Sequence, residues 1–258
     1  MKVVSVREGF EQTFWKHVNQ DPLDYYFFIL DLKEQPDQTE ILLALENERI
    51  KGLMLVYANR IVQLRGNRKA VKLLLDFLDL EKVEMQIPLD CEDIVPRKYE
   101  AQNMQELVLM CMRRKEEHIQ IIHKPVGLGI NDAAEVAEIM RKADPEWWGE
   151  LTDEGLKESL QTRCWLGIRR DQRLVSVGNT RFVDFGSNIG VVATNEHYRS
   201  RGFATSIVSA LVQEIFKNSP IALIHVMKNN APAVHVYTKV GFRPSKNYLL
   251  LRTEKAKQ

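Results

Sequence analysis

The chain has 258 residues, of which 45% are hydrophobic, so it can bury the core of one large domain or of two domains of ordinary size. Its 36 Lys and Arg residues nearly cancel its 35 Asp and Glu residues, and a net charge of +1 argues against nucleic acid or a membrane surface as a partner. The cysteines, Cys91, Cys111 and Cys164, are odd in number and lack C-x-x-C spacing, which disfavours disulfides and a zinc site and predicts a cytoplasmic protein without a metal.

The first half of the chain begins with a segment that acquires charge too early for a secretory signal, and none of its apolar stretches is long enough to span a bilayer. The segment "TEILLALENERIKGLMLVYA" contains two β-like runs separated by Asn47-Glu48 and predicts a hairpin, although its Leu and Ala residues also suit a helix. The other elements predicted in this half are helices at 8–20 and 23–33, within 65–80 and near 92–99, and strands at 61–64, 82–88 and 106–113.

The second half repeats this order of elements after the charged and proline-containing segment 113–125. Helices are predicted from Asn131 or Asp132 and from Thr152, each of which can serve as an N-cap. They are followed by strands at 164–169, 173–182 and 187–194, a helix to about 217, a strand at 221–227, a helix from Ala231 and a strand at 246–252. The repeated order predicts two similar domains, 1–122 and 123–258, although common α/β patterns can also match by chance.

The junction between the third of these strands and the following helix concentrates positive charge and small residues. The strand ends in the uncharged run 191–194, and the turn after it contains Arg199, Arg201, Gly202 and Ala204. The first N–H groups of a helix lack internal partners, and the helix dipole adds positive charge there. Gly202 would let the backbone approach a ligand closely. This junction therefore predicts a site for a phosphate-bearing ligand, with a solvated surface turn as the alternative.

Other phosphate-binding loops are excluded by their missing residues. The sequence contains no G-x-x-x-x-G-K-[ST], and no G-x-G-x-x-G followed by an acidic residue at the end of the next strand. Nucleoside triphosphatases and dinucleotide-dependent oxidoreductases are thus disfavoured.

A second cluster of chemistry-bearing residues lies in "HVMKNNAPAVHVYTKVGFRP", residues 225–244. Asn229 or Asn230 can cap a helix there, and Ala233 and Tyr237 lie four residues apart on one face of it. A phenol beside a ligand can donate a proton to a leaving group, whereas most helical tyrosines are core residues.

Taken together, the two segments contain a pair of spaced patterns. The first is Val192-x-Thr194-x4-Arg199-x2-Gly202-x-Ala204, and the second is Asn230-x2-Ala233-x3-Tyr237-x-Lys239-x-Gly241-Phe242. In order and spacing they resemble the acyl-CoA signature, (Q/R)-x-x-G-x-(G/A), and the second motif of the GNAT acyltransferase superfamily. The resemblance covers about residues 126–252, and the first half looks like a degenerate domain of the same kind, as in glycine N-acyltransferase-like relatives.

This resemblance implies the fold: α/β of the α+β type, with tandem GNAT-like domains that each contain a mixed, mostly antiparallel sheet flanked by helices. It also implies roles for the matching residues. The backbone of residues 192–194 would pair with the pantetheine arm of acetyl-CoA, and the amides that follow would hold its pyrophosphate. The residues implied in donor binding are Val192, Ala193, Thr194, Arg199, Ser200, Arg201, Gly202, Phe203, Ala204, Thr205, Asn230 and Ala233, and Tyr237 is implied as the general acid.

The base that deprotonates the acceptor amine is left open by the sequence. Relatives often place a Glu on the strand before the CoA loop, but residues 187–194 contain no acid. The nearest candidates are Asp184, Glu196 and His225, each of which also suits a purely structural role. The connection that contains Trp147 and Trp148 is expected to contribute to the acceptor pocket, unless these rings serve only the core.

The resemblance implies an acetyl-CoA-dependent N-acetyltransferase that acts on a small-molecule or protein amine by direct transfer. Its partners would be acetyl-CoA and the amine acceptor, without nucleic acid or membrane, and a homodimer is one arrangement that the sequence allows. The alternative from another class is a CoA-binding regulatory or scaffold protein without turnover. The first half lacks both patterns, so a second CoA site is not expected there, although Arg65-Gly66 stands where Arg201-Gly202 stands in the second half.

Overall fold

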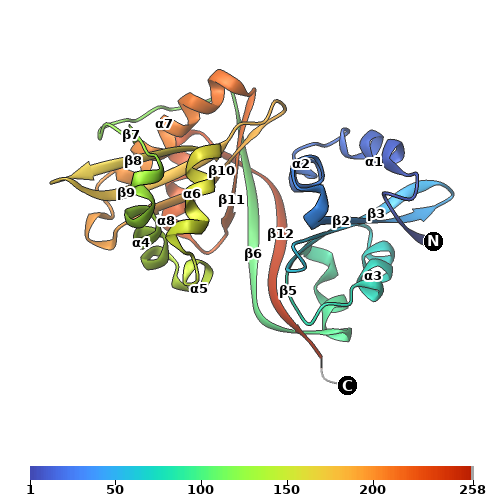
Figure 1. Ribbon diagram of the computed structural model, residues 1–258. Coiled ribbons are helices and arrows are strands. Elements are labelled where there is room, and N and C mark those ends of the chain that lie inside the picture. Colours follow the sequence, from blue (N-terminus) through green and yellow to red (C-terminus); the bar gives the residue numbers. More distant parts are fainter. Residues whose placement is uncertain (257–258) are drawn as a thin grey trace. The chain divides into compact units, whose positions relative to one another are not determined.

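The computed structural model describes residues 1–256, and these form two compact units (Figure 1). The first unit comprises residues 1–108, 227–229 and 246–258, and the second comprises residues 109–226 and 230–245. Each unit is a mixed sheet with helices on its faces. Among the described residues, no helix combines the length and the apolar character that are needed to cross a membrane.

The sheet of the first unit has the order β1-β2-β3-β4-β5-β12-β6. β4 and β5 pair in parallel, whereas the other pairings from β1 to β12 are antiparallel. The strands are β1 (Lys2–Ser5), β2 (Thr39–Glu46), β3 (Arg49–Tyr57), β4 (Ile61–Gly66), β5 (Lys82–Pro88), β6 (Tyr99–Arg113) and β12 (Arg243–Lys255). The helices are α1 (Glu11–Val18), α2 (Tyr26–Glu34) and α3 (Arg68–Phe77), with short 3-10 segments η1 (Pro36–Gln38) and η2 (Leu89–Arg97).

The core of the first unit forms because α3 has one apolar face and lies against strands of alternating side chains. Its residues Ala70, Val71, Leu74 and Leu75 are at most 2% exposed and pack in one cluster with residues of β4, β5 and β12. Asn67 begins the helix, since its side chain accepts a hydrogen bond from the amide of Ala70 at 3.0 Å. Figure 1 shows α1 and α2 on the side of this sheet opposite α3.

The sheet of the second unit has the order β6-β11-β10-β9-β8-β7, and it contains only the last residues of β6. β10 pairs in parallel with β11 and antiparallel with β9. Its further strands are β7 (Val126–Gly127), β8 (Cys164–Arg170), β9 (Arg173–Arg181), β10 (Ser187–Thr194) and β11 (Ile221–Met227). Its helices are α4 (Ala133–Ala143), α5 (Pro145–Trp148), α6 (Asp153–Thr162), α7 (Phe203–Asn218) and α8 (Ala231–Val240), with 3-10 segments η3 (Ile130–Asp132) and η4 (Glu196–Tyr198).

Alternation along β9 shows which helices cover which face of the second sheet. Val177 belongs to a buried cluster with residues of α4 and α6. A Cβ atom at the neighbouring Gly178 would meet Ile207 and Leu211 of α7, at 2.5 and 3.0 Å. Successive side chains of a strand point to opposite faces. α4 and α6 therefore cover one face, and α7 covers the other (Figure 1).

The fold class expected from the sequence is confirmed: each unit contains a mixed, mostly antiparallel set of strands with flanking helices. The hairpin at 39–57 is also confirmed, while β1, β7 and α5 were not expected. The helix expected at 92–99 is the 3-10 segment η2, because Pro96 inside it has no N–H to donate.

The last strand, β12, belongs to the compact unit of the first half and not to that of the second half, where the sequence places it. Residues 248–254 of β12 pair with residues 82–88 of β5. Leu249 and Leu251 join the core cluster of the first unit. The compact units are thus divided differently from the predicted domains 1–122 and 123–258, because β12 buries its apolar side chains in the first unit.

Candidate functional site

The turn between β10 and α7 bends sharply and leaves the first amides of α7 without partners in the helix. Gly202 precedes the helix with φ 82° and ψ 4°, a left-handed conformation that favours glycine, and Ser200 also has a positive φ of 60°. The first hydrogen bond of α7 runs from the amide of Ser206 to the carbonyl of Gly202. The N–H groups of residues 203–205 are therefore available to an anion, as the sequence predicts for this junction.

β10 and β11 separate before they reach this turn. Their parallel pairing covers Ser187, Asn188 and Ile189 opposite Ala222, Leu223 and Ile224. Beyond this pairing, residues 191–194 pair with β9 along one edge, and no other described strand pairs with them. The other edge of residues 191–194 pairs with no described strand, and the carbonyl of Thr194 accepts a hydrogen bond from Arg199. Such an edge can bind an extended ligand as if it were an added strand.

A groove of about 730 Å³ lies between this open edge, the turn and α8. Every residue implied in donor binding or catalysis lines it except Arg201, whose guanidinium lies 5.7 Å from the ring centroid of Tyr198. Lining residues that the sequence did not indicate are Ala143, Tyr198, Pro232, His235 and Val236, and Lys239 of the second pattern also lines the groove. Of these, Val236 lies three residues after Ala233, a helical spacing that could have identified it.

Tyr237 projects from α8 to the wall of the groove. Its side chain is 7% exposed, and burial raises the pKa of its phenol above the ordinary value. Its ring meets Phe242 edge-on with centroids 6.1 Å apart, and its hydroxyl has no hydrogen-bond partner among the described residues. The phenol is thus protonated and available to a ligand at neutral pH.

Of the two candidate caps of α8, Asn229 and Asn230, the structure shows that Asn230 is the N-cap. Its side-chain oxygen accepts a hydrogen bond from the amide of Ala233 at 3.2 Å. The side-chain oxygen serves the helix, so its NH2 group is the part that can reach a ligand in the groove. Arg199 adds a cation on the opposite wall, where its Nε donates to the carbonyl of Thr194 at 3.3 Å.

Residues 122 and 123, which precede β7, contact the turn through ring stacking and hydrogen bonds. The ring of His123 stacks on Phe203 with centroids 4.0 Å apart. Arg170 lies 2.6 Å from its Nδ1 and can only donate, so Nε2 carries the hydrogen and donates to the carbonyl of Arg201 at 2.8 Å. Ser206 accepts hydrogen bonds from the amides of residues 122 and 123. These contacts hold the turn in one conformation.

The candidate bases are spread over different elements. Asp184 lies in the turn before β10, where it accepts from the amide of Phe185 at 2.9 Å, and Glu196 is exposed on η4. His225 directly follows Ile224, the last residue of β11 that pairs with β10. Trp148 packs against the buried cluster of α4 and α6, whereas the side chain of Trp147 lies outside the described part of the structure.

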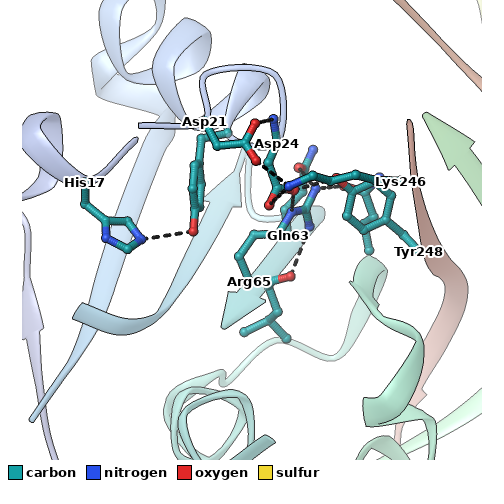
Figure 2. Close-up of polar contacts among 10 residues, drawn as sticks. His17, Asp21, Asp24, Gln63, Arg65, Lys246 and Tyr248 are labelled. Carbon is teal, nitrogen blue, oxygen red and sulfur yellow. Dashed lines mark hydrogen bonds and ion pairs between the residues drawn. The ribbon is translucent and has the colours of Figure 1, made fainter. Parts of the chain in front are cut away.

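The corresponding position in the first unit is filled by the protein's own side chains (Figure 2). β4 and β5 also pair in parallel over three residues, 61–63 opposite 84–86, and both strands continue beyond this pairing. Arg65, which is 4% exposed, donates from Nε to Asp24 at 2.8 Å, and its guanidinium lies 4.0 Å from the ring centroid of Tyr248. Lys246 also contacts Asp24, at 2.9 Å. A hollow of about 520 Å³ remains beside this network.

The described residues contain no group of three or more His, Cys, Asp or Glu side chains that is placed to hold a metal ion. Burial raises the pKa of Cys164, so its thiol is protonated at neutral pH and is a poor nucleophile.

Comparison with known proteins supports the fold that the sequence patterns imply. A family model described as FR47-like protein matches residues 165–251. A Drosophila protein of known structure has a TM-score of 0.67 at 13% identity, over 91% of this chain and 87% of that chain. A GNAT-family acetyltransferase from Colwellia psychrerythraea has a TM-score of 0.59 at 11% identity, over 98% and 100% of the two chains.

A tandem GNAT protein from the clavulanic acid biosynthesis pathway has a TM-score of 0.57 at 11% identity, over 88% of this chain and 86% of that chain. Comparison with curated proteins finds no match. The resemblance to the GNAT superfamily is therefore confirmed in the fold, and the similarity to a tandem protein extends it to both halves of the chain.

Proposed function

We propose that the chain is an N-acetyltransferase that transfers an acetyl group from acetyl-CoA directly to a primary amine in a ternary complex. One observation carries this proposal: the groove brings together an open strand edge, the free amides of a helix and a buried phenol. Each of these matches one part of an acyl-CoA thioester, namely its extended amide-containing arm, its pyrophosphate and its sulfur.

The donor would bind along the length of the groove. The free edge of residues 191–194 would pair with the amides of the pantetheine arm, and the N–H groups at the start of α7 would hold the pyrophosphate. Arg199 supplies a positive charge beside these amides, and the NH2 group of Asn230 faces the same space.

The chemistry follows from the position of Tyr237. The amine nitrogen attacks the thioester carbonyl, a C–N bond forms, and the C–S bond breaks. Tyr237 protonates the sulfur as it leaves, since its phenol is protonated and not engaged with another described residue. The amine gives up its proton to a base or to water, and Asp184, Glu196 and His225 are the candidate bases.

A CoA-binding regulatory or scaffold protein without turnover is the second candidate. It is favoured by one observation, the absence of any carboxylate on β10, the strand that forms the open edge of the groove. Such a protein would keep the contacts to the donor and would lack only the step that deprotonates an acceptor.

Thermal unfolding with and without acetyl-CoA, followed by release of free CoA thiol in the presence of a panel of amines, tests the proposal. A ligand that binds only the folded state raises the apparent stability. We expect acetyl-CoA to raise the unfolding temperature and at least one amine to give steady thiol release. The variant Gly202→Glu, which places a negative charge at the turn, is expected to lose the shift, while Gly202→Ala controls for the strain of the left-handed backbone and for the contact of a Cβ atom with Ile122 at 2.6 Å.

Two results would count against the proposal in different ways. Acetyl-CoA that fails to shift the unfolding temperature contradicts the assignment of the groove. A clear shift without thiol release for any amine contradicts the transferase and supports the regulatory alternative.

A further inference from the structure

The peptide bond between Arg201 and Gly202 is held in its orientation from outside the groove. Nε2 of His123 donates a hydrogen bond to the carbonyl of Arg201 at 2.8 Å, and His123 does not line the groove. The described chain contains no cis peptide bond, and the C=O and N–H groups of a trans peptide point in opposite directions. The N–H of Gly202 therefore points away from His123, and it forms no hydrogen bond with any described residue. Since Gly202 lines the groove, its N–H joins the free amides of residues 203–205.

The same peptide has a second orientation that would repel an anion. Gly202 has a φ of 82°, and glycine adopts negative φ values as readily as positive ones, so a half-turn of this peptide is open to the backbone. The half-turn would direct the carbonyl oxygen of Arg201 toward the groove and the N–H of Gly202 toward His123. A carbonyl oxygen beside a phosphate is unfavourable, because both groups carry negative charge. The hydrogen bond from His123 opposes the half-turn, since Nε2–H would then face another N–H group.

Contacts on three sides fix the imidazole ring of His123 for this hydrogen bond. The ring stacks on Phe203 with centroids 4.0 Å apart, and the backbone amide of His123 donates to Oγ of Ser206 at 3.2 Å. Arg170 donates to Nδ1 at 2.6 Å, so Nδ1 is the acceptor and the hydrogen lies on Nε2. Arg170 is also the charged side chain that contacts the ring, and no carboxylate of the described residues does so.

We infer that His123 is a positioning residue of the donor site: its Nε2–H holds the peptide between Arg201 and Gly202 so that the N–H of Gly202 faces the bound anion. Arg170 acts through His123, because it keeps the correct edge of the ring toward the turn. The inference rests on the proposed function, which makes this anion the pyrophosphate of acetyl-CoA. His123 contacts neither the donor nor the reacting atoms, so the affinity for the donor depends on it and the chemical step does not.

Two substitutions of His123 separate its hydrogen bond from its ring. His123→Phe keeps a ring that can stack on Phe203 and loses the donor, whereas His123→Gln loses the ring and keeps an N–H group about as far from the backbone as Nε2. We expect titration calorimetry on the full chain to show a Kd for acetyl-CoA that rises about tenfold or more in His123→Phe and stays within about threefold in His123→Gln. The control His118→Phe makes the same change at an exposed histidine and should leave the Kd unchanged.

The order of the two variants decides between positioning and packing. A Kd that rises in His123→Gln and not in His123→Phe would assign His123 to packing on Phe203 and overturn the inference, and so would equal Kd values. Steady-state kinetics add a second measurement. In His123→Phe the KM for acetyl-CoA should rise with the Kd, while kcat at saturating acetyl-CoA stays within about twofold. A lower kcat with an unchanged KM would contradict the positioning role.

A double-mutant cycle tests whether Arg170 acts through His123. Arg170→Met should raise the Kd for acetyl-CoA about threefold in the unmodified protein and should have almost no effect in His123→Phe. Arg173→Met removes a cation from the residue that pairs with Arg170 in the sheet, and it should leave the Kd unchanged. Equal effects of Arg170→Met in both backgrounds would show that Arg170 attracts the phosphates by its charge and not through His123.

Inorganic pyrophosphate separates this inference from the proposed function, because it contains the anion without the pantetheine arm or the thioester. The His123 variants should change the Kd for pyrophosphate in the same order as that for acetyl-CoA. Pyrophosphate binding that follows this order, in a protein that does not bind acetyl-CoA, supports the role of His123 and contradicts the proposed donor. Acetyl-CoA binding and turnover that are unchanged in His123→Phe overturn the inference and leave the proposed function intact. A protein that binds neither compound contradicts both.

Discussion

At Tyr237, a single oxygen atom carries the proposed acid catalysis. The hydroxyl has no partner among the described residues, so Tyr237→Phe removes no hydrogen bond within the protein and should leave the unfolding temperature nearly unchanged. We expect kcat to fall about 100-fold, the lower end of the range for loss of a general acid, while the Kd for acetyl-CoA changes less than about threefold. Steady-state thiol release and acetyl-CoA titration measure the two quantities.

The control for this variant is Tyr57→Phe, which removes a phenol hydroxyl from a residue of the first unit that does not line the groove. Its kcat should equal that of the unmodified protein. An undiminished kcat in Tyr237→Phe would remove the acid role, and a parallel loss of acetyl-CoA affinity would assign Tyr237 to binding.

Asp24 determines how the first unit responds to acid. Burial alone would raise its pKa, but the Arg65 guanidinium, the Tyr248 hydroxyl and Lys246 together outweigh burial and lower the pKa below the ordinary value. A carboxyl group with a lowered pKa in the folded state adds stability above its unfolded pKa, about 3.9, and this stability is lost as the pH falls through the folded pKa. We therefore expect the free energy of unfolding to decline below about pH 4. Urea unfolding at a series of pH values measures the decline.

The variant Asp24→Asn identifies the source of this decline. It leaves Arg65 without its carboxylate, so stability at pH 7 should fall, and the decline below pH 4 should become shallower. Asp37→Asn, at an exposed position, should change neither. A decline of equal steepness in the Asp24 variant would show that other carboxyl groups cause it.

Single elements show where local sequence patterns are sufficient and where they are not. The turn before α7 was predicted because its glycine, its charges and the helix start are neighbours in sequence. The same holds for the cap of α8 at Asn230. β12 was recognised as a strand but was assigned to the second half, because alternating apolar residues suit any sheet that offers an apolar face.

The two faces of β12 provide a test of its place in the first unit. Leu251 is 1% exposed within the core cluster, whereas its neighbour Leu250 points to the opposite face and is only partly buried. Leu251→Ala should lower the free energy of unfolding by about 2–5 kcal/mol, as buried leucines do. Leu250→Ala makes the same chemical change and should cost clearly less. Equal losses would mean that β12 is not anchored through this face.

Across the whole molecule, the sequence predicted the class of fold and most residues that line the groove proposed for the donor, but not the pairing of distant segments. The residues of the two patterns meet because a strand, a turn, a helix, a second strand and a second helix follow each other along 192–237. His123 and Arg170 belong to neither pattern, and only the tertiary fold brings them to the turn before α7. The network of Arg65, Asp24 and Lys246 likewise joins distant segments, since Asp24 and Lys246 lie 222 positions apart in the sequence. Such contacts depend on topology, which local spacing does not encode.

The division into units leads to a prediction about fragments. Residues 1–122 contain most of the first unit but lack β12, so β5 would lose its partner along seven residue pairs and the core would lose Leu249 and Leu251. An unpaired edge and a missing part of the core both favour unfolding or aggregation. We expect fragment 1–122 to show no cooperative thermal transition. The same fragment joined by a flexible linker to residues 246–258 should unfold cooperatively, and a cooperative transition in fragment 1–122 alone would show that the first half folds as the independent domain that its sequence suggests.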